Sequence, residues 1–434
     1  HYAKRHAHAF GVAGTQTQNL LWPIVDQGVF DGIAPKLVVI LVGTNNLSCC
    51  PHHTDEDIAK GIEAVVKAVR VKSPDSRVVL MNVLPRDDQS KMQLLRRIRS
   101  INDKIAWIPG HATRCLRQVA ILDIGNEFLD GAQHKYRETL LFFPSHGQTC
   151  HSYCTFCFRW AQFVGNNDLR ISSREVATLH EYLQMHQEIT DLLVTGGDPM
   201  VMKTSRLQEY LQPLTAPELE HLRTIRIGTK SLTFWPYRFV TDPDADDLLR
   251  LFSNLIAEGK HVAIMAHFEH GREMEGPVVR EAVRRILDTG AVIRTQAPVL
   301  RHINDDADVW SSMWKEQVHM GMVPYYMFVE RDTGARRYFE LPLERACQIY
   351  RDAIQNVSGL ARTARGPSMS AAPGKVEVQG VANVQGEKVF VLRFIQARNP
   401  DWVQRPFFAK YDPQATWLDQ LSPAFGAEKF FFEE

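Results

Sequence analysis

An alternation of short apolar strands and amphipathic helices, repeated between residues 136 and 356, constrains the fold of this chain more than any other feature. The pattern predicts strands at 140–143, 192–195, 224–227, 262–266, 292–295 and 325–329, and helices near 173–188, 204–213, 243–258, 276–290, 308–320 and 342–356. Strands that alternate with helices pair in parallel, so six such units in series predict an α/β fold with a partial (βα)6 barrel. We expect its chemistry at the C-terminal ends of the strands.

The first third of the chain repeats this alternation on a smaller scale. Buried strands are predicted at 36–42, 77–83 and 119–124, with helices at 55–71 and 89–106 between them. This order predicts a partial doubly wound, flavodoxin-like α/β layer. After about residue 365 the pattern weakens into Gly-, Pro- and Ser-containing loop, with a β-like stretch at 389–394. We therefore expect three domains: an incomplete α/β segment at 1–131, the barrel at 132–365 and a C-terminal extension at 366–434.

The charge balance excludes some partners. The 434 residues include 50 Lys and Arg and 50 Asp and Glu, so the chain has no net field to attract nucleic acid or an acidic membrane surface. No apolar run approaches the roughly 20 residues that cross a bilayer, and the first residues lack the apolar core of a signal peptide. We expect a cytoplasmic protein without nucleic-acid or membrane partners.

Three cysteines fall within eight positions, directly after the first predicted barrel strand: Cys150, Cys154 and Cys157. Thiolates are soft ligands that suit iron–sulfur clusters, and three of them leave one iron of a four-iron cluster without a protein ligand. The alternative is a structural zinc site, which needs a fourth ligand such as His146, His151 or Cys347.

The cysteine loop resembles that of the radical S-adenosylmethionine (SAM) enzymes, in which SAM chelates the open iron and is cleaved to a 5′-deoxyadenosyl radical. The resemblance implies a [4Fe-4S] cluster and SAM as cofactors, with Cys150, Cys154 and Cys157 as the metal ligands. Phe156 fits the aromatic position that this family uses against the adenine. Gly196, Gly197 and Asp198 lie at the end of the second barrel strand, where the family binds the amino group of SAM.

From about residue 134 to 378 the sequence looks like the lysine 2,3-aminomutase family. The matching stretches are Lys135-Tyr136, Arg159, Ile225-Arg226-Ile227-Gly228-Thr229, His267-Phe268-Glu269-His270, Gln296, Leu300-Arg301-His302-Ile303-Asn304-Asp305, Pro324-Tyr325-Tyr326 and Ala372-Pro373-Gly374-Lys375-Val376. The resemblance implies an isomerase that also holds pyridoxal 5′-phosphate (PLP) and moves an amino group between neighbouring carbons of a small amino acid. It further implies an electron donor such as flavodoxin or ferredoxin, and leaves open whether the chain forms a homo-oligomer.

The same resemblance assigns roles to individual residues. It places the lysine that carries PLP at Lys375, in a Gly-containing loop. Contacts to the PLP phosphate fall on Lys135, Tyr136 and Arg137, and a contact to the substrate carboxylate falls on Arg159. His267 and Gln296 are further cofactor-binding positions.

The sequence departs from the lysine enzyme where that enzyme has two aspartates for the distal ammonium of lysine. An ungapped reading gives Arg331 and Ser368, which favours a glutamate-like substrate. A gap of one residue would restore Glu330 or Asp332, so lysine stays open. The cysteines of the family's structural zinc site are absent, with Asp306 at one of these positions, and we expect no zinc.

Residues 10–130 look like a partial SGNH (GDSL-type) hydrolase of the platelet-activating-factor acetylhydrolase branch. Gly14 and Asn45 match residues that donate to the oxyanion in that family. The Gly-Asp-Ser block and the Asp-x-x-His block are missing, and Asp130 and His134 have the wrong spacing to replace the latter. We expect an inert scaffold module, with esterase activity as the alternative. A natural fusion, a mis-joined gene and an engineered chimera all fit this arrangement.

Overall fold

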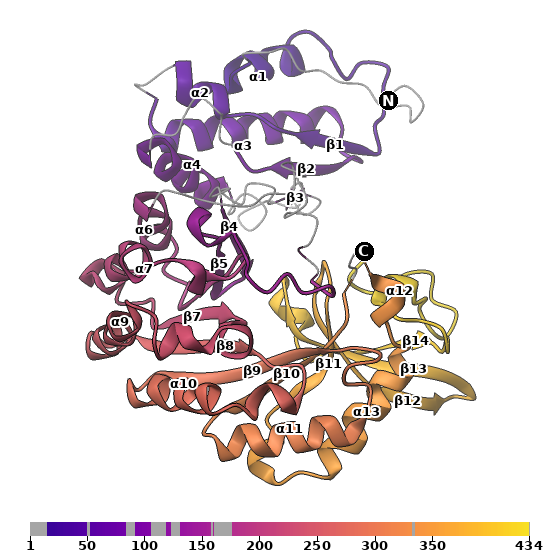
Figure 1. Cartoon of the computed structure of the whole chain (residues 1–434). Helices are drawn as coiled ribbons and strands as arrows, with labels where there is room; N and C mark the ends of the chain where they lie inside the picture. The colour runs from indigo at the N-terminus through magenta and orange to yellow at the C-terminus, as the bar shows by residue number, and fades with distance from the viewer. Residues whose placement is uncertain are drawn as a thin grey trace. The chain divides into compact units, whose positions relative to one another are not determined.

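The computed structural model describes residues 15–49, 53–83, 92–105, 119–122, 131–157, 159, 176–331 and 335–433. The chain divides into two compact units, unit 1 at His1–Phe128 and unit 2 at Leu129–Glu434. Each is described by itself below, and Figure 1 labels their elements. The three-domain division stays a prediction.

Unit 1 contains a parallel three-stranded sheet in the order β1-β2-β3 within its described residues. Its elements are α1 (Thr17–Val25), β1 (Leu37–Ile40), α2 (Thr44–Cys49), α3 (Asp55–Lys72), β2 (Arg77–Met81), α4 (Met92–Ile105) and β3 (Val119–Leu122). All of the strands and helices predicted in this region are present within a few residues of their expected bounds. The predicted α/β layer is therefore confirmed.

Helix α3 shows how local sequence sets these elements. The Thr54 hydroxyl accepts a hydrogen bond from the Asp57 backbone N–H, and the Asp57 carboxylate accepts one from the Thr54 N–H. This capping box satisfies donors that a helix start leaves unpaired. Apolar residues such as Ile58, Ile62 and Val65 recur at helical spacing and form the buried face of α3. On β1, by contrast, alternate apolar side chains remain exposed.

Unit 2 is built on an eleven-stranded sheet, in the order β14-β13-β12-β11-β10-β9-β8-β7-β6-β5-β4 within the described residues. Its elements are β4 (Ala132–Tyr136), β5 (Thr139–Phe142), α6 (Val176–Met185), β6 (Asp191–Val194), α7 (Thr204–Leu211), β7 (Thr224–Thr229), α8 (Ser231–Phe234), α9 (Ala245–Ala257), β8 (His261–His267), α10 (Pro277–Asp288), β9 (Val292–Val299), α11 (Ala307–His319), β10 (Val323–Val329), α12 (Arg336–Phe339), α13 (Leu343–Gln355), β11 (Arg365–Ser370), β12 (Gly374–Val384), β13 (Glu387–Ala397) and β14 (Pro406–Lys410).

Strands β5 to β10 pair in parallel, each with the next in sequence order. This confirms the six predicted βα units. In Figure 1 the helices α9, α10, α11 and α13 line the outer side of these strands. Side chains along β9 alternate between buried and half-buried, so one face of the sheet packs in the core and the other carries partly accessible groups.

The region after residue 365 differs from the prediction. It is not mostly loop: β11 pairs in parallel with β10, and β12, β13 and β14 continue the same sheet in antiparallel order. Lys375, expected in a loop, is the second residue of strand β12. Strand β4, which the sequence pattern did not predict, pairs antiparallel with β5 and forms the other edge of the sheet. None of the helices in the described parts is long and apolar enough to span a membrane.

Candidate active site

The three clustered cysteines follow β5, at the C-terminal end of the first parallel strand of unit 2. The Cys157 N–H donates to the Cys154 carbonyl at 2.9 Å, which closes a tight turn between the second and third cysteines. Tyr153 enters this turn with φ of 41°, a left-handed conformation that is strained for a tyrosine. All three cysteines are half-buried and free of disulfides. The predicted loop therefore has the compact, constrained backbone that a metal-binding loop needs.

Among the described residues, the cysteine sulfurs do not form the tight donor group that a single zinc ion needs. With Zn–S bonds of about 2.3 Å, tetrahedral zinc holds its sulfurs about 3.8 Å apart. Among the described residues, the one set of three or more His, Cys, Asp or Glu donors within 4.8 Å of each other does not include any cysteine. Neither His146 nor His151 completes such a group with the cysteines. The loop is therefore more open than a single-ion site.

Burial disfavours the charged thiolate forms of the cysteines. It raises the pKa of Cys154 to about 12 and also raises the pKa of Cys157. Iron bound at these sulfurs would stabilise the thiolate forms, as metals do for buried thiols. The donor set thus fits the [4Fe-4S] cluster expected from the sequence.

The Gly-Gly-Asp-Pro segment packs directly against the start of the cysteine loop. The Gly197 N–H donates to the Gly147 carbonyl at 3.0 Å, and the Asp198 N–H donates to the Thr149 carbonyl at 2.9 Å. A Cβ atom on Gly197 would lie 2.2 Å from the Thr149 carbonyl oxygen. Gly196 has φ of +154°, which favours glycine. The two glycines are therefore required for β6 and the cysteine loop to approach each other.

We expect the substitution Gly197→Ala to displace the cysteine loop, because the new methyl group would meet backbone rather than a flexible side chain. Overpacking of this kind costs about 1–3 kcal/mol or more. Thermal unfolding and iron content after anaerobic reconstitution measure the two effects. Gly276→Ala is the matched control, because a Cβ there meets no atom within 4 Å. A Gly197→Ala variant that keeps wild-type iron content would contradict this account.

Asp198 and Arg159 both hold this junction together. The buried Asp198 carboxylate accepts hydrogen bonds from the Thr229 hydroxyl at 2.7 Å and from the Lys230 N–H at 2.9 Å, which ties β6 to the end of β7. The Arg159 guanidinium is buried and donates to the Gly196 carbonyl at 2.8 Å and to the Gln148 side chain at 3.2 Å. Burial lowers the pKa of Arg159 to about 10. The predicted contact of Arg159 with a substrate carboxylate is untested.

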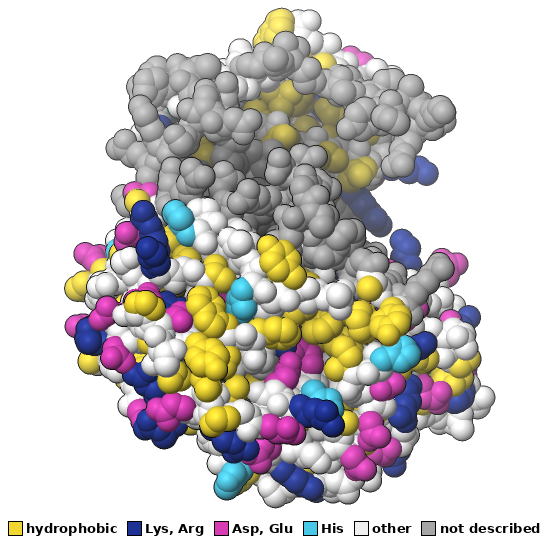
Figure 2. Space-filling view, in the orientation of Figure 1, with side chains coloured by type: hydrophobic (Ala, Val, Ile, Leu, Met, Phe, Trp, Pro, Cys, Tyr) yellow, Lys and Arg dark blue, Asp and Glu magenta, His cyan; other side chains and the backbone are white. Residues whose placement is uncertain are grey.

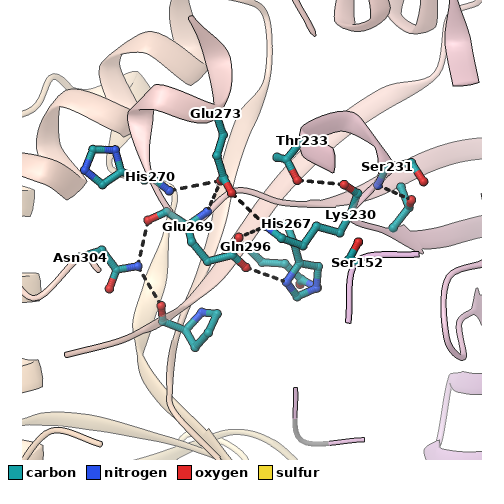
Figure 3. Close-up of polar contacts among 12 residues, drawn as sticks. Ser152, Lys230, Ser231, Thr233, His267, Glu269, His270, Glu273, Gln296 and Asn304 are labelled. Carbon is teal, nitrogen blue, oxygen red and sulfur yellow. Dashed lines mark hydrogen bonds and ion pairs between the residues drawn. The ribbon is translucent and has the colours of Figure 1, made fainter. Parts of the chain in front are cut away.

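A buried ion-pair network lies at the ends of β7 and β8 (Figure 3). The Lys230 amine forms ion pairs with the Glu269 carboxylate and, at 3.1 Å, with Glu273. Burial alone would lower the pKa of Lys230, but the two carboxylates raise it overall. The Lys230 charge also acts on Cys154, which places this network beside the cysteine loop. Sequence patterns did not single out Lys230 or Glu273 as site residues.

His267 and Gln296, both predicted as cofactor-binding residues, meet where the last residue of β8 pairs with the middle of the neighbouring strand β9. Gln296 Nε2 lies 2.9 Å from His267 Nε2 and donates to it, which places the imidazole proton on Nδ1. Nδ1 in turn faces Glu269 Oε1 at 3.8 Å. The chain therefore fixes the orientation of both side chains beside the C-terminal end of β8, and ligands of such sheets bind at these strand ends.

A group of cations surrounds Lys375 on β12. Its amine lies 3.8 Å from the centre of the Tyr326 ring, and the Arg365 guanidinium lies 4.3 Å from the same ring. Burial lowers the pKa of Lys375 well below its usual value, and the charges of Lys135 and Arg365 lower it further. Burial also lowers the pKa of Lys135 to about 8, with a contribution from Arg331. Within the described residues, no carboxylate pairs with Lys135, Arg365 or Lys375.

Two buried phenol groups in this region also lack partners. The Tyr136 and Tyr326 hydroxyls have no hydrogen-bond partner among the described residues. A phosphate would accept hydrogen bonds from phenols and balance the surrounding positive charge. The residues present therefore fit PLP, with Lys375 as the amine that would carry it. Tyr326 and Arg365 belong to this group but were not predicted as site residues.

The remaining predicted site residues are not part of the groups described above. Phe156 is half-buried and packs edge-on against Phe339, with ring centres 5.9 Å apart. Arg137 is exposed, and no contact with the Lys375 group is seen. In unit 1 the Asn45 side chain donates to the Thr15 carbonyl at 2.9 Å, while Gly14, Asp130 and Asp332 lie outside the described residues.

Figure 2 shows a band of hydrophobic side chains on the visible face of unit 2, between areas of acidic and basic side chains. Large exposed hydrophobic residues of this unit include Tyr153 in the cysteine loop, Phe234 and Tyr338. Exposed aromatic groups of this kind are common where ligands or partners bind.

The parallel sheet, the three-cysteine loop at its first strand and the adjoining Gly-Gly turn together define a radical SAM protein. A putative L-lysine 2,3-aminomutase of Aquifex aeolicus (strain VF5) is 34% identical over 325 residues, which cover 74% of this chain and 83% of the relative. The chain therefore belongs to the lysine 2,3-aminomutase family, as the sequence motifs predicted. The [4Fe-4S] cluster, SAM and PLP expected for it are the cofactors of that family.

Other relatives have different names. The L-lysine 2,3-aminomutase of Escherichia coli (strain K12) is 26% identical over 270 residues, covering 61% of this chain and 72% of the relative. The glutamate 2,3-aminomutase of Clostridioides difficile (strain 630) is 27% identical over 261 residues, covering 59% of this chain and 58% of the relative. These names do not decide between the two substrates for this chain.

Residues 1–142 match the GDSL-like Lipase/Acylhydrolase family, which confirms the resemblance predicted for the first third. Among solved structures, Streptococcus suis SuiB bound to S-adenosylmethionine aligns over 61% of this chain and 53% of that chain, with a TM-score of 0.38 and 9% identity. The likeness is too low to add to the assignment of the fold.

Proposed function

We propose that the chain is a PLP-dependent amino-acid 2,3-aminomutase that uses radical SAM chemistry. The observation that supports this most is the Lys375 amine, which lies among other cations and buried phenols in the same sheet that leads into the cysteine loop. When bound, the cluster and SAM supply a 5′-deoxyadenosyl radical, and PLP supplies the π-system through which the amino group moves.

The residues of the chain then have separate tasks. Cys150, Cys154 and Cys157 hold the cluster through thiolate sulfurs, and the Gly-Gly turn fixes the position of their loop. The lowered pKa of Lys375 keeps a larger fraction of its amine neutral, which is the form that reacts with an aldehyde. Lys135 and Arg365 provide positive charge for the phosphate. We keep Arg159 as the proposed partner of the substrate carboxylate.

Anaerobic reconstitution with iron, sulfide and PLP tests the proposal. The loaded protein should cleave SAM to 5′-deoxyadenosine only when a reductant is present, and should convert an α-amino acid to its β-isomer. A flavodoxin- or ferredoxin-type protein is the proposed reductant in the cell. Protein that carries a full cluster and PLP but produces no β-amino acid from any common amino acid would contradict the assignment.

We further propose that the substrate is a dicarboxylic amino acid such as glutamate. Arg331 follows β10, and its charge acts on Lys135, so it lies near the Lys375 group. Ser368 stands at the second of the two positions where the lysine enzyme has aspartates. It is fully buried on β11 and has no charge to offer an ammonium group. A positive field repels the distal ammonium of lysine and attracts a second carboxylate.

Glutamate should therefore exceed lysine in kcat/KM by about 100-fold, the ratio that corresponds to a charge preference of about 3 kcal/mol. The substitution Arg331→Glu should reduce or reverse this preference while leaving the cluster intact. Arg351→Glu on α13 is the matched control. Lysine as the best substrate of the wild-type protein would rule out the proposed specificity without affecting the proposed reaction.

For unit 1 we propose a module without hydrolytic activity. The Asn45 amide, a predicted oxyanion donor, is engaged by the Thr15 carbonyl. Hydrolysis of an acyl ester that persists in a Cys150→Ala variant would overturn this proposal.

A further inference from the structure

A second group of metal-ligating side chains lies in unit 2, on elements that do not carry the cysteines or Lys375. His134 comes from the edge strand β4, and His186 and Glu188 come from the connection between α6 and β6. One ligand atom of each lies within 4.8 Å of the others, and all three residues are half-buried. No other set of three such donors occurs in the residues that the structure describes.

Short contacts already bring the side chains of this group together. His186 Nδ1 lies 2.9 Å from Glu188 Oε1. The His134 and His186 rings are nearly perpendicular, at 85°, with centres 5.3 Å apart, so they approach each other without stacking. Tyr182 stacks on His186 with ring centres 4.1 Å apart and limits rotation of that imidazole. These contacts therefore restrict the orientation of the His186 ring.

The donor set indicates the class of ion. Two imidazoles and a carboxylate suit Zn²⁺ and similar divalent transition metals, whereas Ca²⁺ and Mg²⁺ prefer oxygen donors. Bonds of about 2.0–2.2 Å place donors about 3.3–3.6 Å apart, so small side-chain rotations suffice to close the group. We propose that His134, His186 and Glu188 bind one Zn²⁺-class ion, with solvent at the remaining position.

Binding competes with the hydrogen bond between His186 Nδ1 and Glu188 Oε1, and it also requires His134 to exchange one hydrogen bond. Its Nδ1 lies 3.1 Å from the Tyr182 hydroxyl, and its Nε2 lies 3.0 Å from the Arg137 carbonyl. Either bond is a single neutral contact, worth about 1 kcal/mol net, whereas a metal–imidazole bond contributes several times more. The exchange is therefore favourable when the ion is available.

An ion bound at this site would also affect residues of the Lys375 group. Strand β4 is the edge of the sheet and pairs only with β5 among the described strands. His134 directly precedes Lys135 and Tyr136, whose side chains belong to the proposed PLP site. An ion that joins His134 to the segment after α6 would fasten β4 and fix these two residues. Its role is structural and separate from the radical chemistry.

Titration with Co²⁺ tests the proposal on the protein after the three cysteines of the loop are filled by the reconstituted cluster. We expect one Co²⁺ per chain, with ligand-field absorption bands but without the thiolate-to-cobalt charge-transfer bands of a cysteine site. His186→Gln and Glu188→Gln should each weaken binding by about 10-fold or more. His146→Gln is the matched control, because His146 is exposed and contacts only the Tyr210 hydroxyl among described neighbours.

The conservative Tyr182→Phe variant keeps all three donors and the stacked ring, and should keep Co²⁺ binding. Cluster content and circular dichroism establish that each variant is folded. Wild-type protein that binds no stoichiometric Co²⁺, or Glu188→Gln protein that binds as tightly as wild type, would overturn the proposal. Neither result would affect the proposed aminomutase reaction, which is measured separately.

Discussion

Replacing Cys154 with alanine should abolish the [4Fe-4S] cluster and reduce SAM cleavage to background. A cluster of this kind needs a ligand for each protein-bound iron, and the loop offers one cysteine for each of three irons. Because burial raises the pKa of Cys154 to about 12, its thiolate depends on the bound iron, and the remaining two cysteines cannot compensate. Iron and sulfide analysis after anaerobic reconstitution measures the loss.

Cys347→Ala is the matched control for this experiment. Cys347 is also half-buried, and burial raises its pKa to about 12, but its sulfur lies 3.1 Å from the Val378 carbonyl and takes no part in the loop. This variant should keep the full cluster. A cluster that survives in Cys154→Ala and is lost in Cys347→Ala would mean that the ligands have been misassigned.

Lys375→Ala should lose covalent PLP while it keeps the cluster, and turnover should fall by at least about 1,000-fold, as when an essential nucleophile is removed. Reduction with borohydride followed by mass spectrometry detects the link between PLP and the lysine. Because the pKa of Lys375 is lowered, the neutral amine is present at lower pH than in a free lysine. The pH midpoint for covalent loading should therefore lie well below 10.5.

Lys388→Ala is the matched control for this second experiment, since Lys388 is a lysine on the neighbouring strand β13 with its amine over the Tyr411 ring. It should load PLP as the wild type does. A reduced PLP adduct on a lysine other than Lys375 in the wild-type protein would show that the amine has been misassigned, whether or not the Lys375→Ala variant folds.

The sequence predicted the six parallel βα units because their strands are apolar and their helices amphipathic, which are local patterns. It missed β11 and β12 because their sequences contain residues that strands disfavour. Strand β11 includes Gly366 and Pro367, and β12 includes Gly374 and Gly380. Pairing with β10 and β13 stabilises these strands despite their composition.

The candidate site was predictable in part for the same reason. Spacing located the cysteines, whereas the Gly-Gly turn was located by its position after the second barrel strand and by the family resemblance. Arg365 carries no such signal, and Tyr326 was matched only within the stretch Pro324-Tyr325-Tyr326, without a role. The importance of both comes from the approach of strands distant in sequence. Asp198 and Arg159 were expected to face ligands, but the structure shows each bound to backbone at the junction of β6 with its neighbours. Their proposed ligand contacts need direct measurement.

The position of Lys375 on a late strand has a consequence for how the protein matures. The cysteine loop is synthesised more than 200 residues before this lysine, and it packs against β6, which follows it closely. The amine, by contrast, reaches its surroundings only when β12 has joined the sheet through β11 and β13. The residues that hold the iron can therefore be in place on a growing chain before the surroundings of the PLP lysine have formed.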